Sequence, residues 1–412
     1  MSVTTESVSR SAHTHNETQR PVFHTTYARL TDALATVGLA ICSNTAVPIM
    51  AGVLLESSNG DLVLNGFDYE TAISVRIPEA ATTQGRLLVD HTELTKLMNA
   101  LVKGTRKREA ERLPVTISAT DTTSATVELA DSTMPLTTLP LDDYPTLPAT
   151  PPTTARVDRE VFTTELKRVL PAVGQDATLP PLEGVKFDLS PSQLTLAATD
   201  RYRIAVAHLP VTSTLPAQDS GVLVHGGLLV KLAKKFTGDH VGFGWQHDEE
   251  PYPTMVALTC GEITVRTRSI DGDFPDYVRL LTSETPVAIV ADRAELLTQT
   301  RRAQAVLSAK RDASKTVTLT VDPESVTVAP RLSEQPEQVS TPRLAANVVG
   351  ISQATQFGVN PQYLCEALDS FTGQTVTLHA QTPTTPMLLT DAPDGLGDPT
   401  AFRHLIMPIR LD

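Results

Sequence analysis

Cysteine is scarce in this sequence: its 412 residues include three, Cys42, Cys260 and Cys365. They lie far apart, are odd in number and form no Cys-x-x-Cys pair. These features exclude a disulfide framework and a zinc site of the usual ligand spacing. Isolated thiols fit a reducing compartment, so we expect a cytoplasmic protein.

Aromatic residues, long apolar runs and excess positive charge are also lacking. With 4% aromatic residues, the cores must be built mainly from leucine, valine, alanine and isoleucine. No apolar run approaches the length of a membrane span, and we expect no membrane association. The net charge of −13 excludes a protein that is basic overall, so any surface for nucleic acid must be local.

The first 22 residues are polar and rich in serine, threonine and histidine. They lack the apolar stretch of a signal peptide. We therefore predict that residues 1–22 form a disordered extension.

Residue patterns for catalysis are weak. Asp271 and Asp273 have side chains that bind metals, but they precede Phe274 and Pro275 in a turn-like segment. The segment 226–235 contains glycines and lysines but lacks the P-loop pattern. The sequence therefore predicts no enzyme and no bound cofactor or metal. A metal-dependent hydrolase built on Asp271 and Asp273 is the alternative from another functional class.

Two patterns recur along the chain at similar intervals. In the first, alternating apolar and polar residues flank a turn at 52–68; the pattern returns 132 residues later at 184–200, and again near 317–328. Such alternation around a short turn is typical of a β-hairpin. A second pattern, a short strand followed by a helix, recurs every 135 residues. Its copies begin near Val89, Val224 and Val359.

Together the two patterns predict an α+β fold made of three tandem copies of one unit, each with two helices and several antiparallel strands. The expected boundaries of the units are 23–149, 150–282 and 283–412. The first helices are expected near 27–42, 159–172 and 292–309, and the second near 91–102, 226–236 and 361–371.

Four segments carry a resemblance to a known family: ATDRYRIAV (198–206), DGDFPDYVRLL (271–281), FGVNPQYL (357–364) and HLIMPIRL (404–411). In this order, on a three-fold repeat, they resemble the bacterial β sliding clamp, the processivity subunit of the replicative DNA polymerase III. The resemblance implies a homodimer closed head to tail into a ring, with helices around the hole. It also implies a non-catalytic function in DNA replication: the ring encircles duplex DNA and tethers the polymerase, and a separate clamp loader uses ATP.

Clamps that this chain resembles bind short extended peptides from polymerases, the clamp loader, repair polymerases and other partners in a groove between the second and third units. Apolar members of the groove would receive a leucine or phenylalanine anchor, and polar members would hydrogen-bond the peptide. Carried over from the matching motifs, the groove residues here are Leu182, Thr199, Arg201, Tyr202, Arg203, Ile204, Pro275, Arg279, Leu280, Asn360, Tyr363, Met407, Pro408, Ile409 and Arg410.

Basic residues fall on the polar faces of the expected helices, where lysine and arginine usually only contact solvent. The resemblance adds a role for them: lining a channel that contacts DNA phosphates without regard to base sequence. These residues are Lys96, Lys103, Lys167, Arg168, Lys231, Lys234, Lys235, Arg301 and Arg302. For the dimer interface the resemblance points to Val306 and Leu307, although the helical spacing of Leu307 from Thr300 and Ala303 also fits a core position.

Three positions depart from the family pattern. Asn44 stands where a clamp often has an arginine that contacts DNA, and Thr282 replaces a usual proline. Arg201 stands where many members have a small residue, so we expect it to narrow the groove and to favour acidic peptides. These departures leave open a spare clamp whose altered groove escapes a clamp-binding inhibitor or toxin.

Overall fold

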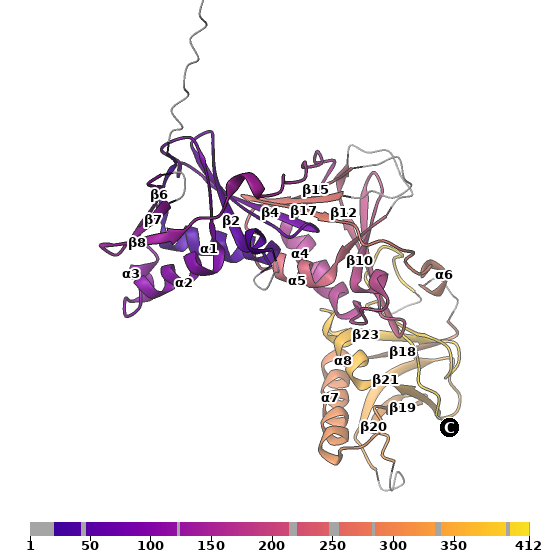
Figure 1. Ribbon diagram of the computed structural model, residues 1–412. Coiled ribbons are helices and arrows are strands. Elements are labelled where there is room, and N and C mark those ends of the chain that lie inside the picture. Colours follow the sequence, from indigo (N-terminus) through magenta and orange to yellow (C-terminus); the bar gives the residue numbers. More distant parts are fainter. Residues whose placement is uncertain are drawn as a thin grey trace, which may run out of the picture. The chain divides into compact units, whose positions relative to one another are not determined.

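The computed structural model describes residues 20–42, 47–121, 124–213, 221–246, 255–281, 285–333, 339–392 and 396–411. The chain forms two compact units, Met1–Leu147 and Pro148–Asp412. Their elements are labelled in Figure 1. Residues 1–19 of the expected extension, Asn44 and Thr282 lie outside the described residues.

Unit 1 combines antiparallel sheets with a layer of helices. One sheet has the strand order β1 (Val22–Thr26), β6 (Pro114–Ala119), β7 (Ser124–Leu129) and β8 (Ser132–Thr137). The other strands follow the order β4 (Thr71–Ile77), β3 (Asp61–Phe67), β2 (Gly52–Ser58) and β5 (Arg86–Asp90). The helices are α1 (Tyr27–Val37), α2 (His91–Leu101) and the short α3 (Lys107–Ala110).

The ordered part of unit 1 begins earlier than the sequence predicted. Val22 is the first residue of β1 and pairs with Ser118 of β6. The carbonyl of Pro21 accepts a hydrogen bond from the amide of Ala119 at 3.1 Å, and the carbonyl of Arg20 accepts one from the Thr83 hydroxyl at 2.6 Å. Val22 therefore belongs to the first sheet, and Arg20 and Pro21 are held against unit 1 by hydrogen bonds rather than extending from it. The sequence did not indicate this start of the strand because the residues before it are polar.

Unit 2 is built around one long antiparallel sheet. Its strand order is β14 (Val222–His225), β10 (Gly184–Leu189), β11 (Gln193–Thr199), β12 (Arg203–Pro210), β25 (Arg403–Ile406), β24 (Met387–Thr390), β23 (Thr375–Ala380), β18 (Val287–Asp292), β21 (Arg343–Val349), β20 (Ser325–Pro330), β19 (Val317–Asp322) and β22 (Thr355–Val359). Further strands follow the order β13 (Thr212–Ser213), β9 (Ala155–Asp158), β15 (His240–Gln246), β16 (Met255–Cys260) and β17 (Ile263–Arg268). The helices are α4 (Arg159–Val169), α5 (Gly226–Leu232), α6 (Val278–Leu281), α7 (Arg293–Lys310) and α8 (Pro361–Asp369).

Both repeat patterns are confirmed by these elements. The hairpins predicted from the first pattern are β2–β3, β10–β11 and β19–β20. The six predicted helices are α1, α2, α4, α5, α7 and α8. Helix α5 ends at Leu232, earlier than the predicted 236, because two glycines at its start and Thr237-Gly238 after it weaken the helix. No helix in the described part of the chain is long and apolar enough to cross a membrane.

Each of these six helices starts where a strand ends. The N-cap is the last residue of that strand, or the next one, and its side chain accepts a hydrogen bond from an amide two or three residues further on. Such a cap contributes about 1 kcal/mol because it satisfies an amide that the helix cannot pair. The caps are Thr26, Asp90, Asp158, His225, Asp292 and Asn360.

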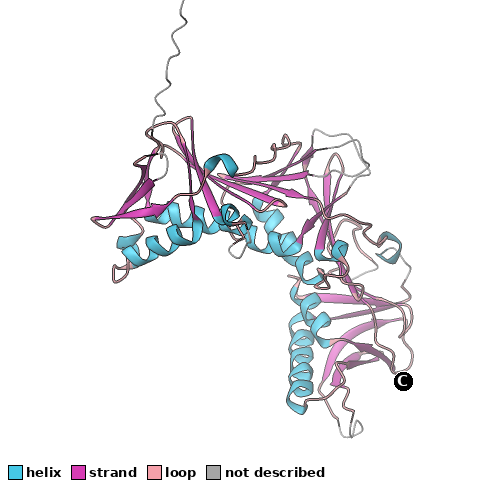
Figure 2. Cartoon of the chain, in the orientation of Figure 1, coloured by secondary structure: helices cyan, strands magenta, loops and turns pink. Residues whose placement is uncertain are grey.

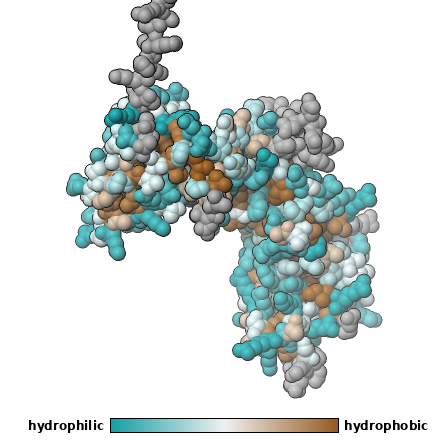
Figure 3. Space-filling model, viewed as in Figure 1, coloured by the Kyte–Doolittle hydropathy of each residue, from teal (hydrophilic) through white to brown (hydrophobic). Residues whose placement is uncertain are grey.

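The core of unit 2 uses more aromatic packing than the composition suggested. The ring of Phe162 on α4 lies 5.4 Å from that of Phe243, 6.3 Å from that of Phe187 and 6.4 Å from that of Phe236. A few phenylalanines are therefore concentrated at one place, where α4 packs on the sheets. Figure 2 shows α7 and α8 side by side on one face of the strands of residues 287–390. On the visible face in Figure 3, the same part of the chain is mostly hydrophilic, with small apolar patches.

Helix α7 separates the two residues that were expected at a dimer interface. Leu307 is 5% exposed and belongs to the buried face of the helix, with Thr300 and Ala303. Val306 is 41% exposed and lies on the outer face. Neighbouring helical residues point about 100° apart, so Val306 and Leu307 can lie on different faces of α7. Leu307 therefore packs in the core of its own chain, as its helical spacing predicted, and Val306 is the exposed member of the pair.

We predict that Leu307→Glu lowers the free energy of unfolding of unit 2 by roughly 3 kcal/mol or more, because it removes a packed side chain and buries a carboxylate. Val306→Glu is the matched control, and its effect should stay within about 0.5 kcal/mol. Urea unfolding followed by circular dichroism measures both values. Equal losses in the two variants would contradict the assignment of Leu307 to the core.

Candidate functional site

A cleft of about 390 Å³ opens on unit 2. Its wall comes from the loop after α4, from the turn between β11 and β12, and from the first turn of α8. The lining residues are Val173, Gly174, Gln175, Asp176, Leu179, Leu182, Asp200, Arg201, Tyr202, Arg203, Gln362 and Tyr363. The cleft thus joins chain segments that are far apart in the sequence.

The turn between β11 and β12 is shaped by Asp200. One carboxylate oxygen of Asp200 accepts hydrogen bonds from the amides of Tyr202 at 3.0 Å and Arg203 at 3.1 Å. The hydroxyl of Thr199 donates to the carbonyl of Arg203 at 2.8 Å and closes the turn from the other side. Arg201, at the tip, takes a φ of +79°. This left-handed conformation costs an L-residue with a side chain roughly 1 kcal/mol.

The same turn occurs in unit 1, at the equivalent place of the repeat. Asp68 accepts hydrogen bonds from the amides of Glu70 at 3.0 Å and Thr71 at 2.6 Å. Tyr69 takes a φ of +75° and its side chain is 54% exposed. The conformation of Arg201 is therefore a property of the repeated turn, which directs the side chain at this position outward.

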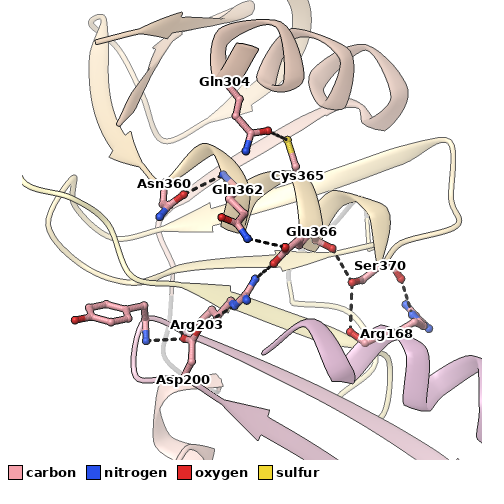
Figure 4. Close-up of polar contacts among 10 residues, drawn as sticks. Arg168, Asp200, Arg203, Gln304, Asn360, Gln362, Cys365, Glu366 and Ser370 are labelled. Carbon is pink, nitrogen blue, oxygen red and sulfur yellow. Dashed lines mark hydrogen bonds and ion pairs between the residues drawn. The ribbon is translucent and has the colours of Figure 1, made fainter. Parts of the chain in front are cut away.

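Arg203 holds the turn against α8, as Figure 4 shows. Its guanidinium is almost fully buried, donates to Asp200 at 3.0 Å and forms an ion pair with Glu366. The same group lies 4.4 Å from the centre of the Tyr363 ring, a cation–π contact. The ring of Tyr363 is in turn stacked on that of Tyr202 at 6.3 Å. Two tyrosines and one arginine thus form a fixed aromatic wall.

Helix α8 carries the other half of this network. Asn360 caps the helix by accepting from the amide of Gln362 at 2.9 Å, and the Gln362 side chain donates to Glu366 at 3.1 Å. Glu366 therefore contacts both Gln362 and Arg203, two residues that line the cleft, and these contacts fix its carboxylate. Asn360 was expected to bond a peptide, but its side-chain oxygen is occupied by the helix cap.

Arg168 was expected in a DNA channel, but its side chain is largely buried and bonded to other residues of unit 2. Its side chain is 16% exposed and donates to the carbonyl of Ser370 at 2.7 Å and to Glu165 at 2.9 Å. The guanidinium lies 3.9 Å from the centre of the Phe402 ring. These contacts tie α4 to the end of α8 (Figure 4), so Arg168 is a structural residue of unit 2.

The other basic residues of the expected channel are more accessible. Lys96, Lys103, Lys167, Lys231, Lys234, Arg301 and Arg302 are exposed, and Lys235 is half-buried. Arg301 forms an ion pair with Asp369 at 2.7 Å, which reduces its availability for a phosphate. On α5, Lys231 is exposed while Leu229 and Leu232 are buried, and Lys234 and Lys235 follow the end of the helix.

The C-terminal segment borders the cleft through its backbone. The amide of Met407 donates to the carbonyl of Tyr202 at 2.8 Å, and that of Ile409 donates to the carbonyl of Gly358 at 2.8 Å. Pro408, between them, has no amide hydrogen and therefore needs no hydrogen-bond acceptor. Met407 is 38% exposed beside the turn. The segment is therefore the end of the last described strand, and its backbone is held at two points.

The structure brings together only part of the expected groove. Five of its members line the cleft: Leu182, Arg201, Tyr202, Arg203 and Tyr363. Ile204 instead packs in a core cluster with Tyr277, Leu281 and Leu405, so it is not a free surface. Others are exposed without lining the cleft, namely Pro275, Arg279, Leu280, Met407 and Arg410, while Thr199 is buried and Asn360, Pro408 and Ile409 are half-buried.

From the segment between α4 and β10, only Leu182 was predicted from the sequence as a groove residue. The loop in this segment also supplies Val173, Gly174, Gln175, Asp176 and Leu179 to the cleft. The loop carries no regular apolar pattern, and none of the four matching motifs covers it. Only the two consecutive prolines that follow, Pro180 and Pro181, marked a fixed loop in the sequence.

The alternative of a metal-dependent hydrolase gains no support. Within the described residues, no group of three or more histidine, cysteine, aspartate or glutamate side chains is placed to hold a metal. Asp271 and Asp273 are exposed and flank Gly272, whose φ of +115° belongs to a turn. A turn in this segment explains the positions of both Asp271 and Asp273.

A fully buried imidazole lies behind the cleft. Both ring nitrogens of His404 on β25 are buried without a hydrogen-bond partner. Burial, together with the positive charge of nearby Arg203, lowers the pKa of His404 to about 3. Burial also lowers the pKa of His379, which contacts the Thr390 hydroxyl at 2.9 Å, to about 4. Both histidines are therefore neutral in the folded protein at neutral pH.

Comparison with known proteins matches this architecture along its length. Models of the N-terminal, central and C-terminal domains of the DNA polymerase III beta subunit match residues 22–148, 156–276 and 278–410. The chain is 31% identical over 385 residues to the beta sliding clamp of Streptomyces coelicolor, covering 93% of this chain and 97% of that protein. It is 26% identical over 384 residues to the beta sliding clamp homolog GriR of Streptomyces muensis, covering 92% and 97%.

Solved structures show the same fold. The DNA polymerase sliding clamp from Bacillus subtilis superposes with a TM-score of 0.80 at 20% identity, covering 96% of this chain and 100% of that one. A DnaN sliding clamp from Pseudomonas aeruginosa bound to griselimycin gives a TM-score of 0.80 at 22% identity, covering 95% and 100%.

The repeated α+β architecture and the three matching domain models define the class: a three-domain DNA clamp. Within that class, the chain belongs to the DNA polymerase III beta subunit family, the bacterial beta sliding clamps.

We predict that unit 2 loses stability as the pH falls below about 6.5. In the unfolded chain the pKa of His404 returns to this usual value for histidine. Because the folded pKa of His404 is depressed, its contribution to stability is present above about pH 6.5 and falls as the pH drops toward 3. At about pH 5 the wild type should have lost on the order of 2 kcal/mol of its free energy of unfolding because of His404, and His404→Phe should not show this loss. The control is His240→Gln, which changes an exposed imidazole of the same unit.

The chain's one tryptophan, Trp245, is 5% exposed in β15, so its fluorescence reports unfolding of unit 2. Urea titrations at pH 7 and pH 5 give the acid-induced loss for each variant. An acid-induced loss in His404→Phe as large as in the wild type would contradict the assignment.

Proposed function

We propose that this chain closes as a homodimeric ring around duplex DNA and tethers polymerases and other partners through the cleft of unit 2. The observation that carries the proposal is the cleft itself, whose aromatic wall is held rigid by buried Arg203. Partners include the replicative polymerase, a clamp loader and repair polymerases, and the chain acts in the cytoplasm without catalysis of its own. Family membership and the fold support this function.

The DNA-facing surface is assigned to the exposed lysines and arginines of the helices. Contacts between such side chains and phosphates do not depend on base sequence and exchange easily along a duplex. The net charge of −13 disfavours DNA binding over most of the surface, so the duplex would be held only where the helices gather positive charge. A ring with this distribution slides on DNA without reading it.

We predict that reversing Lys231, Lys234 and Lys235 to glutamate weakens association with DNA by at least about tenfold at 50 mM salt. The loss of affinity should be independent of DNA sequence. It should also become smaller as the salt concentration rises, because the variant releases fewer counterions on binding than the wild type does. The matched control reverses Arg86, Arg156 and Arg343, which are exposed on strands and give the same change in net charge.

Retention on circular and linear DNA, measured with the mass in solution, tests the ring. A loaded ring stays on a circle and slides off a free end. A monomer at micromolar concentration, or equal loss in the two triple variants, would contradict the proposed ring and DNA surface.

The cleft suits an extended peptide with one or two apolar anchors. Leu179 and Leu182 supply apolar surface, the stacked Tyr202 and Tyr363 supply a flat wall, and Gln362 supplies a hydrogen-bonding amide. Short peptides of this kind gain affinity from a few buried anchors and from backbone hydrogen bonds. A rigid cleft avoids the entropy cost of ordering its own side chains on binding.

We predict that deleting Met407–Asp412 lowers the affinity for a labelled Gln-Leu-x-Leu-Phe peptide by at least about tenfold, or 1.4 kcal/mol. The deletion removes the hydrogen bond to Tyr202 and the exposed Met407 beside the turn, while β25 ends before it at Ile406. Tyr363→Ala, which removes the stacking partner of Tyr202, should act in the same direction.

Fluorescence anisotropy gives the affinities, and circular dichroism checks that each variant is folded. Wild-type affinity in the folded truncated protein would remove the C-terminal segment from the site.

A further inference from the structure

Two opposite charges meet at the cleft from separate segments. A guanidinium nitrogen of Arg201, on the turn between β11 and β12, lies 3.6 Å from a carboxylate oxygen of Asp176. Asp176 belongs to the loop after α4, where it also accepts hydrogen bonds from the amide and hydroxyl of Thr178 at 3.1 and 2.6 Å. The carboxylate is thus fixed to its own loop, and Arg201 reaches toward it. The ion pair links two of the segments that line the cleft.

The two arginines of the cleft are bound very differently. Arg203 is buried and has Asp200 and Glu366 as partners. The side chains of Arg201 and Asp176 are 55% and 48% exposed, and their separation of 3.6 Å is long for an ion pair. Such a pair is weak because water competes for both charges. A ligand can therefore exchange it, whereas the network of Arg203 stays in place.

We propose that Arg201 selects peptides by their charge: an acidic side chain of the peptide takes the place of Asp176 on Arg201. This inference rests on the proposed function of the cleft as a peptide site. A peptide with a carboxylate at the matching position keeps Arg201 paired after the exchange. A neutral peptide forms no charge pair with Arg201, and it loses the contact with Asp176 without replacement wherever it separates the two side chains, so it binds more weakly.

The repeat shows that the cation is not required by the turn. Tyr69 occupies the equivalent position in unit 1 with nearly the same φ, +75° against +79°. A positive φ strains the backbone when the residue carries an L side chain, and glycine adopts it without this strain. Arg201→Gly therefore removes the charge while the hydrogen bonds of Asp200 keep the turn closed. This variant separates charge recognition from folding.

The experiment compares two labelled peptides with identical apolar anchors, one with glutamate and one with glutamine next to them. The full-length proteins are wild type, Arg201→Gly, Arg201→Lys and Asp176→Asn. The matched control is Arg86→Ala, which breaks an ion pair of 3.7 Å with side chains 50% and 40% exposed, far from the cleft in sequence. Fluorescence anisotropy at 50 and 500 mM salt gives the ratio of the two affinities for each protein.

We expect the wild type and the Arg86→Ala control to prefer the acidic peptide by about 3- to 5-fold at low salt. Arg201→Lys should keep most of this preference, and Arg201→Gly should abolish or reverse it, since Asp176 and Asp200 then repel the glutamate. Asp176→Asn should raise the preference, because the competing carboxylate is gone. High salt should bring all ratios toward one.

An unchanged ratio in Arg201→Gly would overturn the inference while leaving the cleft as a peptide site. Loss of affinity for both peptides in Asp176→Asn would also overturn it, because Asp176 would then be a positioning residue and not a competitor. Failure of every protein to bind either peptide would overturn the proposed function instead.

Discussion

The buried guanidinium of Arg203 is the point at which the two sequence-distant halves of unit 2 are joined at the cleft. It belongs to β12, yet its partners include Glu366 and Tyr363 of α8. Taking a charge out of water costs several kcal/mol, and that cost is offset only when all of its partners are in position. The turn of Asp200, the start of β12 and the first turns of α8 are therefore ordered together or not at all. The aromatic wall of the cleft is a consequence of this network.

Arg201 and Arg203 flank Tyr202 in the turn and have different functions. Arg203 faces inward, is shielded from solvent and fixes geometry. Arg201 faces outward with a weak partner, so its charge remains available to a ligand. The left-handed conformation at the tip produces this division, because it directs one side chain away from the strand that the other enters. Rigidity and selectivity thus come from adjacent residues with different exposure.

Local patterns in the sequence were sufficient for the repeated elements. Alternation around short turns predicted the hairpins, and strand-end caps such as Asp90 and Asp292 explain why the helices start where they do. The sequence also contained the correct answer for Leu307, whose spacing from Thr300 and Ala303 marks a core face. The helical spacing of Leu307 predicted its burial within α7's own chain, whereas its position at a dimer interface, which the family resemblance implies, stays a prediction.

Long-range contacts were beyond the reach of the sequence. Glu165 lies three residues before Arg168 and pairs with it on α4, but nothing in the sequence indicated the Phe402 ring that covers the guanidinium. Asp176 is an isolated acid in an irregular loop, and its proximity to Arg201 depends on how α4 packs against the sheet. Such residues acquire their role only when the chain is folded, so periodicity carries no signal for them.

The place of the last strand in the sheet has a consequence for synthesis of the protein. Strand β25 is the last of the described strands in sequence but lies inside the sheet, between β12 and β24. Until β25 has left the ribosome, one side of β12 is an unpaired edge, and its row of free amides and carbonyls is a template for pairing with other chains. The N-terminal part of unit 2 leaves the ribosome first and must wait for this strand. Nascent chains of this protein are therefore exposed to mispairing, and to rescue by chaperones, until β25 pairs with β12.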